Sequence, residues 1–161
     1  MSEHQFQEMS YEEILSREDA LFIIYARKDD ELLARALQEP GMKGNIDKSY
    51  FGHTLLAYAA MDGRAETAAL LLKSGADPKV KNAPDLGTAL HYAVRSQNWN
   101  VMRVLASDPR FLETASYKDS FGCIPEDYAL TSTSSILAYA GVFTSLYSFE
   151  DYVSVRRGHE E

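Results

Sequence analysis

The residue types that most often carry out chemistry are few in this sequence and lie far apart. There are four histidines, His4, His53, His91 and His159, and a single cysteine, Cys123. One cysteine excludes an internal disulfide and a zinc site built from several thiolates. No sequence neighbour of Cys123 would lower the pKa of its thiol, so we interpret it as a bystander and not as a nucleophile.

Motifs that bind phosphate, activate a serine or hold a catalytic zinc ion are missing. The sequence contains no G-x-x-x-x-G-K loop, no G-x-S-x-G elbow and no H-E-x-x-H helix. The acidic pairs Glu12-Glu13 and Asp29-Asp30 offer fewer oxygen ligands than a cation loop requires. Helix N-termini that favour carboxylates explain them better. The sequence therefore predicts a non-enzymatic protein without a cofactor or metal site.

The composition is that of an ordinary globular chain. Its 161 residues suit one domain, and 45% hydrophobic residues are enough for a core without disulfide or metal staples. The net charge of −8 argues against a general nucleic-acid binder. No apolar run approaches the roughly 18 residues of a membrane span, and the first residues lack a secretory pattern. We expect a cytoplasmic protein, with a secreted form whose leader has been removed as the alternative.

A recurring dipeptide indicates how the chain is organised. Tyr-Ala occurs five times, and the first four copies, which begin at Tyr25, Tyr58, Tyr92 and Tyr128, are spaced 33, 34 and 36 residues apart. Each unit reads as a short Ala-rich helix, a turn and a second helix. One such helix pair cannot bury its apolar face alone, so several must stack. Equivalent positions in successive units predict that the tyrosines pack between the stacked helices.

The second unit resembles an ankyrin repeat. Its residues Gly52-His53-Thr54-Leu55-Leu56-Ala57-Tyr58-Ala59-Ala60, the turn residue Gly63, Leu70-Leu71-Leu72 and Gly75-Ala76-Asp77-Pro78 follow the family pattern. That pattern is G-x-T-P-L-H-x-A-A, a glycine turn, a leucine-rich helix and G-A-D. The third unit keeps the family histidine at His91, which the resemblance implies ties the turn together by hydrogen bonds. The implied fold is an all-α solenoid of about four helix-turn-helix units with degenerate terminal caps.

These patterns divide the chain into three parts. We expect an N-terminal extension over 1–16, a repeat domain over 17–141 and a non-repeat tail over 142–161. In the extension, Ser10-Tyr11-Glu12-Glu13 predicts a capping box that opens a short helix. The repeat units are predicted at 17–44, 45–78, 79–115 and 116–141. The tail is rich in aromatic and β-branched residues, and its period does not decide between strand and helix.

The third unit departs from the family pattern at both of its turns. Leu86 stands where the family places a glycine, so this turn is expected to be irregular. Between the helices, Ser96-Gln97-Asn98 replaces the glycine. We expect Asn98 to provide the left-handed residue there, because asparagine tolerates that conformation better than most residues.

Ankyrin proteins bind other proteins through their turn tips and the inner face of their first helices, and the resemblance implies the same positions here. These are Tyr50, Phe51, His53, Met61 and Asp62 in the second unit, Pro84, Asp85, Arg95 and Ser96 in the third, and Ser120, Phe121 and Cys123 in the fourth. Tyr50, Phe51 and Phe121 are expected to be exposed on independent grounds, since large aromatics at such turns have little core to enter. The alternative is that Phe51 or Phe121 folds back onto the adjacent tip.

The negative charge is concentrated at the two ends of the chain. Residues 1–44 and 111–161 carry −5 each, residues 45–78 carry −1, and residues 79–110 carry +3. Terminal repeats need a polar outer face for solubility. The overall acidity therefore does not by itself predict a basic partner.

We expect a stand-alone binding protein that recognises one protein partner on this surface and blocks or regulates it. By family analogy, the interpretation extends to an immunity protein that neutralises a bacterial toxin. An adaptor or scaffold role is one alternative. A ligand-binding or enzymatic role around Phe143–Tyr152 is the other, and a deep polar pocket with shifted pKa values would support it.

Overall fold

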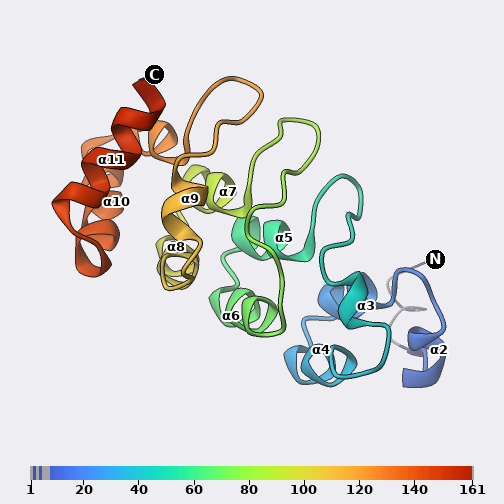
Figure 1. Cartoon of the computed structure of the whole chain (residues 1–161). Helices are drawn as coiled ribbons and strands as arrows, with labels where there is room; N and C mark the ends of the chain where they lie inside the picture. The colour runs from blue at the N-terminus through green and yellow to red at the C-terminus, as the bar shows by residue number, and fades with distance from the viewer. Residues whose placement is uncertain (1, 3, 5–7, 161) are drawn as a thin grey trace.

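Short helices in antiparallel pairs follow one another along a row in the computed structural model (Figure 1). The structure describes residues 2, 4 and 8–160, with the side chains of 158–160 left aside. The elements in this part of the chain are α2 (Tyr11–Leu15), α3 (Ala20–Ala26), α4 (Asp30–Ala36), η1 (Lys43–Asn45), α5 (Leu55–Asp62), α6 (Ala65–Lys73), α7 (Ala89–Arg95), α8 (Trp99–Ala106), α9 (Phe111–Ala115), η2 (Pro125–Thr131), α10 (Thr133–Leu146) and α11 (Phe149–Glu160). The predicted all-α solenoid is confirmed.

Capping side chains mark where helices begin, as the sequence predicts. The Thr54 hydroxyl accepts a backbone N–H of the first turn of α5, and Ser132 does the same for α10. At α2, the backbone N–H of Ser10 donates to a Glu13 carboxylate oxygen at 2.7 Å, which confirms the expected capping box. Each cap gives a partner to a backbone N–H that has none within the helix.

Alanine faces let the helix pairs stack closely. Ala57, Ala59 and Ala60 of α5 and Ala68 of α6 are fully buried. Helix α5 packs both on α6 of its own pair and on α7 of the next. The small side chains bring the helices together, and Leu71 fills the space between them with no exposed surface. The core therefore runs along the whole stack instead of forming a separate centre in each unit.

The repeat tyrosines belong to a column of aromatic rings along the stack. Tyr25 contacts Tyr58 at 6.1 Å between ring centroids. The His53 ring lies 5.5 Å from Tyr58 and 5.4 Å from Tyr92, and so bridges the second and third units. Tyr25 and Tyr92 are buried and Tyr58 is half-buried. The column confirms that these tyrosines pack between successive units.

The turn between the helices of a pair uses one left-handed residue in each of the first three units. These residues are Lys28, Gly63 and Gln97, with φ of 58°, 72° and 57°. The expectation that Asn98 would be left-handed is wrong, because its φ is −84°. The Asn98 side chain instead links two units, since its Nδ2 donates to the carbonyls of Ala60 and Met61, at 2.7 and 3.0 Å.

Two further irregularities lie in the third unit. Leu86, in place of the family glycine, adopts φ of 57°, so the turn keeps its left-handed geometry with a bulky residue. The long connection after α8 contains the extra helix α9, whose Phe111 is buried. The added length is therefore packed against the solenoid and does not form a free loop.

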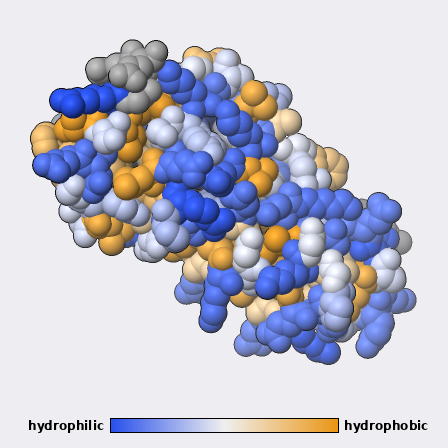
Figure 2. All heavy atoms as spheres, viewed as in Figure 1, coloured by the Kyte–Doolittle hydropathy of each residue, from blue (hydrophilic) through white to orange (hydrophobic). Residues whose placement is uncertain are grey.

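The described part of the C-terminal segment consists of two helices, α10 and α11, separated by Tyr147 and Ser148. Helix α10 crosses position 141, where the repeat region was expected to end, so the backbone has no break there. Helix α10 contains no charged residue, and Leu137 and Leu146 are exposed on it. Figure 2 shows hydrophobic surface at this end of the molecule, on the left of the view.

We predict that Asn98→Ala lowers the free energy of unfolding by about 1–3 kcal/mol, because two carbonyls at the end of α5 lose their donor. Urea denaturation, with the m-value unchanged, measures the loss. Asn100→Ala is the matched control, since Asn100 is exposed, and it should shift stability by no more than about 0.5 kcal/mol. Equal effects of the two substitutions would contradict the role assigned to Asn98.

Candidate partner-binding surface

Three loops project from the same side of the stack (Figure 1). We call them the tip loops: residues 46–54, 79–88 and 116–124. Each is closed by backbone hydrogen bonds, Tyr50 with His53 in the first, Asn82 N–H to Gly87 O in the second, and Asp119 N–H to Cys123 O in the third. The tip loops are also joined to one another. Ala83 N–H donates to Gly52 O and Ser120 N–H donates to Asp85 O, both at 2.8 Å.

A large apolar side chain stands exposed on each tip loop. The exposed fractions are 87% for Phe51, 46% for Leu86 and 73% for Phe121. Phe51 and Leu86 are left-handed, with φ of 52° and 57°. For a bulky residue this conformation costs on the order of 1–2 kcal/mol. Phe51 and Phe121 are thus exposed as expected and do not fold back into the core, although the Phe51 ring touches Phe22 at 5.7 Å.

Tyr50 is the clearest correction among the expected binding residues. It is only 7% exposed, because its ring stacks on Phe22 at 5.2 Å. The first unit has no tip loop of its own, and Tyr50 covers that end of the stack. Its hydroxyl has no hydrogen-bond partner among the described residues. Tyr50 is thus a packing residue, whereas Leu86, absent from the expected set, takes its place as an exposed apolar residue.

The other expected residues are only partly free. Asp62, Pro84, Arg95, Ser96 and Ser120 are exposed, whereas His53, Met61, Asp85 and Cys123 are half-buried. Asp62 is engaged by the hydroxyl of Tyr25 at 2.6 Å. The set is therefore a mixture of exposed positions and of side chains that hold the tip loops in place.

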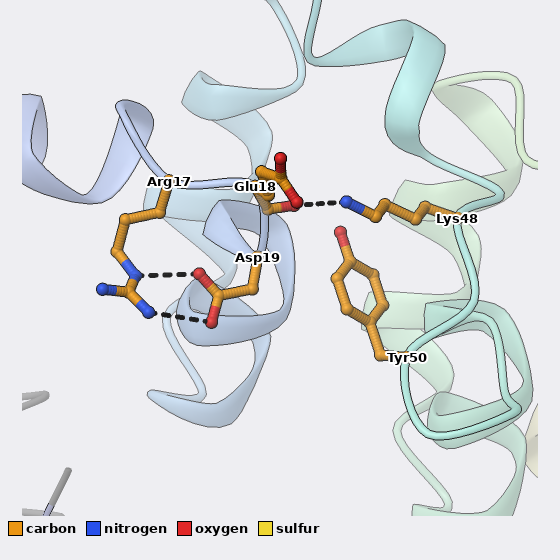
Figure 3. Close-up of a pocket in the computed structure, with 5 residues that line it drawn as sticks. All are labelled: Arg17, Glu18, Asp19, Lys48 and Tyr50. Atoms are coloured by element: carbon orange, nitrogen blue, oxygen red, sulfur yellow. Dashed lines mark hydrogen bonds and ion pairs between the residues drawn. The ribbon is translucent and has the colours of Figure 1, made fainter.

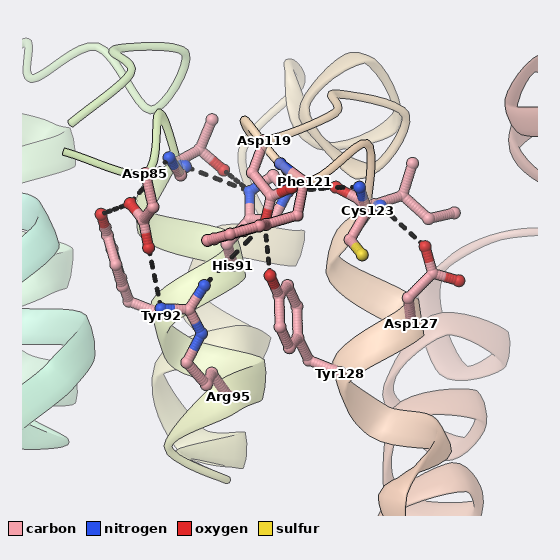
Figure 4. A network of polar contacts seen from close by, with 12 residues as sticks. Asp85, His91, Tyr92, Arg95, Asp119, Phe121, Cys123, Asp127 and Tyr128 are labelled. Carbon is pink, nitrogen blue, oxygen red and sulfur yellow. Dashed lines mark hydrogen bonds and ion pairs between the residues drawn. The ribbon is translucent and has the colours of Figure 1, made fainter. Parts of the chain in front are cut away.

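Asp85 and Arg95 belong to a polar network between the second and third tip loops (Figure 4). One Asp85 oxygen accepts from the Tyr92 hydroxyl at 2.5 Å, and the other pairs with Arg95 at 2.8 Å. Burial would raise the pKa of Asp85, but these donors hold it below its usual value. Burial and the Asp85 carboxylate raise the pKa of Tyr92. The network fastens the second tip loop to α7.

Asp119 holds the third tip loop in place, as Asp85 does for the second. Its side chain is fully buried and accepts the backbone N–H groups of Phe121 and Cys123 at 2.9 and 3.0 Å, together with the hydroxyl of Tyr128. Burial and this hydrogen bond raise the pKa of Tyr128 to about 12. The Arg95 guanidinium lies over the Tyr128 ring at 4.5 Å. The loop that presents Phe121 is therefore held by one buried carboxylate.

His91 joins the third unit to the fourth, as the resemblance implies. The backbone N–H of Thr88 donates to Nδ1 at 3.1 Å, which leaves Nε2 as the donor to the Cys123 carbonyl at 3.0 Å. His91 is fully buried, and burial lowers its pKa. Burial and, to a smaller extent, the nearby Asp119 carboxylate raise the pKa of the Cys123 thiol. His91 thus links two units of the fold, and the raised pKa of the Cys123 thiol disfavours its thiolate form.

Asn82 is a linking residue that reasoning from the sequence missed. It is 2% exposed, accepts the backbone N–H of Thr54 at 2.8 Å and donates to Gly87 O at 2.9 Å. It joins the start of α5 to the second tip loop. The sequence feature that could have indicated this link is the position of Asn82, which lies 28 residues after Thr54 and inside the next unit.

An open hollow of about 470 Å³ lies beside the first tip loop (Figure 3). It is lined by Arg17, Glu18, Asp19, Lys48 and Tyr50. Arg17 donates to both oxygens of Asp19, at 2.8 and 3.2 Å, and Lys48 donates to the Glu18 carbonyl at 2.9 Å. The Lys48 contact joins the segment before α3 to the first tip loop.

Polar groups around Phe143–Tyr152 also serve packing. The buried Glu126 accepts from the Tyr152 hydroxyl and pairs with Arg156 at 3.1 Å, which fastens α11 to η2. The Phe111 ring stacks with Tyr147 at 5.1 Å.

Within the described residues, no cluster of three or more His, Cys, Asp or Glu side chains is arranged to hold a metal ion. No described helix combines the length and apolar character needed to cross a membrane.

The family profile described as ankyrin repeats, in three copies, matches residues 21–115. The match spans more than half of the chain, which therefore belongs to the ankyrin-repeat family. Ankyrin repeats are modules for protein–protein interaction, and the family is typically non-enzymatic.

We predict that Asp119→Ala costs at least about 2 kcal/mol of unfolding free energy, because three donors lose one charged acceptor. Chemical denaturation followed by circular dichroism tests it. Ser120→Ala, one residue away on an exposed side chain, should stay within about 0.5 kcal/mol of wild type. A loss below about 1 kcal/mol for Asp119→Ala would show that the loop is held in another way.

We also predict that the protein loses stability as the pH falls below about 6.5. Burial places the pKa of folded His91 below its unfolded value of about 6.5, so the unfolded chain binds more protons in that range. Stability is then complete above the unfolded pKa and decreases toward the folded one. Urea midpoints measured about one pH unit above, at and below the unfolded pKa give this slope.

His91→Gln tests the assignment, because it removes the titrating ring and should flatten the slope over the same pH range. His53→Gln, at a half-buried histidine, is the matched control and should keep the wild-type slope. A slope that survives in His91→Gln would assign the dependence to other groups.

Proposed function

We propose that this ankyrin-repeat chain binds a protein partner through its tip loops, with Phe51, Leu86 and Phe121 as the apolar anchors. The observation that carries the proposal is that three successive tip loops each expose one large apolar side chain. Such side chains are typical interface anchors. The left-handed backbone at Phe51 and Leu86 adds weight, because residues that cost stability at a surface tend to be kept for function.

Binding is proposed to act by occlusion. A rigid row of tip loops, joined by backbone hydrogen bonds, can cover a partner's active or binding surface without contributing chemistry of its own. Inhibition or regulation of the partner is the expected consequence. An immunity protein that blocks a toxin is one case of this mode, and an adaptor that only holds its partner is the alternative.

We predict that the double variant Phe51→Asn, Phe121→Asn loses its partner while staying folded. Asparagine tolerates the left-handed conformation of Phe51, and Phe121 is not left-handed, so the backbone keeps its shape while each tip loses an anchor worth at least about 2 kcal/mol. Affinity capture from the native host, followed by titration calorimetry on the captured partner, measures the loss. A loss of about 100-fold or more is expected.

The matched control is Leu137→Asn, Phe149→Asn, which removes two exposed apolar residues from the other end of the molecule. This control should bind like wild type. A folded tip variant that retains every partner would contradict the proposal. The immunity case has its own readout, since co-expression with the captured partner should protect cells and the tip variant should not.

A further inference from the structure

The carboxylates of the tip loops are turned inward and already occupied. Asp85 is bound by Tyr92 and Arg95, and Asp119 by Tyr128 and two backbone N–H groups. Asp47 accepts the backbone N–H of Asp77 at 2.9 Å. The negative charges of these loops therefore serve the fold and are largely withdrawn from the outer surface.

Three lysine side chains of the same loops, in contrast, remain exposed. Lys48, Lys81 and Lys118, which lie in the first, second and third tip loops, are exposed, whereas Lys79 of the second loop is half-buried and pairs with Glu113 at 3.6 Å. Lys48 and Lys81 each donate to one backbone carbonyl, at 2.9 and 3.2 Å, which leaves further N–H groups on each free. Lys118 has no side-chain partner among the described residues. Each loop thus presents one available cation with its apolar anchor, although the whole chain carries −8.

The spacing of the tip loops limits which secondary structure of a partner can contact all three apolar anchors. Packed helices lie about 8–10 Å apart, so successive tip loops recur at about that interval. On one face of a β-strand, side chains recur at about 6.6 Å and every second one at about 13 Å, and neither distance matches the interval between the tip loops. An α-helix returns the same face every seven residues, or about 10.5 Å.

We propose that the tip loops accept an acidic amphipathic helix of the partner protein. Its apolar residues at i, i+7 and i+14 would meet Phe51, Leu86 and Phe121, and its carboxylates would meet Lys48, Lys81 and Lys118. The proposal rests on the proposed function and adds the chemistry of the partner. Opposite charge around an apolar contact also speeds the encounter and makes it salt-dependent.

Three synthetic helical peptides of about 20 residues test this on the full chain. The first carries leucines at i, i+7 and i+14 with glutamates beside them, the second has lysines in place of every glutamate, and the third is a scramble of the first. Fluorescence anisotropy at about 50 and 300 mM salt gives the affinities. The acidic peptide should bind at least about 10-fold more tightly than either control and weaken at high salt.

Charge reversal on the protein supplies the second arm. The variant Lys48→Glu, Lys81→Glu, Lys118→Glu should lose at least about 10-fold in affinity for the acidic peptide. The matched control reverses three exposed cations outside the tip loops, Lys43→Glu, Lys73→Glu and Arg157→Glu, and should bind like wild type.

Several outcomes would overturn the inference. These are no binding of the acidic peptide, equal binding of the lysine peptide, or equal loss in the two charge-reversal variants. If a natural partner still depends on Phe51 and Phe121 but not on the three lysines, the proposed function stands and its acidic-helix form fails. If the partner is indifferent to Phe51 and Phe121, both fail.

Discussion

Successive helix pairs leave backbone groups at their ends that find their partners in a neighbouring unit, and the rest of the structure depends on this. The carbonyls at the end of α5 are satisfied by Asn98, from the following pair. Thr54 N–H is satisfied by Asn82 in the next tip loop, and the Cys123 carbonyl by His91 from the previous unit. A unit taken alone would bury these groups unpaired, so order extends along the stack.

The same internal use of polar groups explains why the outer surface of the tip loops is not acidic, although the composition of the chain is. Tip-loop carboxylates act as acceptors for tyrosine hydroxyls, backbone N–H groups and Arg95. Because they are occupied internally, the outer surface of the loops is left with apolar and cationic side chains. The net charge along the sequence therefore does not describe the outer surface of the tip loops.

Sequence reasoning recovers what is set by local pattern. The capped helix start at Ser10 and the tyrosine column follow from spacing and residue type, and the role of His91 follows from the family resemblance. It misses what depends on contacts between units. Asn98 was assigned to the turn because of its own preference, yet its side chain is engaged by the carbonyls of α5, and Gln97 takes the left-handed position.

Tyr50 and Leu86 exchanged roles for similar reasons. Tyr50 is buried because the first unit lacks a tip loop and Phe22 offers a ring to stack on, which no local pattern reveals. The period of the tail did not decide between helix and strand, and its aromatic residues pack on separate elements, Phe143 on Phe111 and Tyr152 on Glu126 of η2.

The left-handed conformation of Phe51 and Leu86 has a consequence for anyone who redesigns this chain. A procedure that selects substitutions by thermal stability, or that averages many ankyrin sequences, would replace both residues by glycine or asparagine. The product would melt at a higher temperature and show a well-formed solenoid. It would also have lost two of the three apolar side chains that are exposed on the tip loops, so a gain in stability at these two positions would come with the loss of that surface.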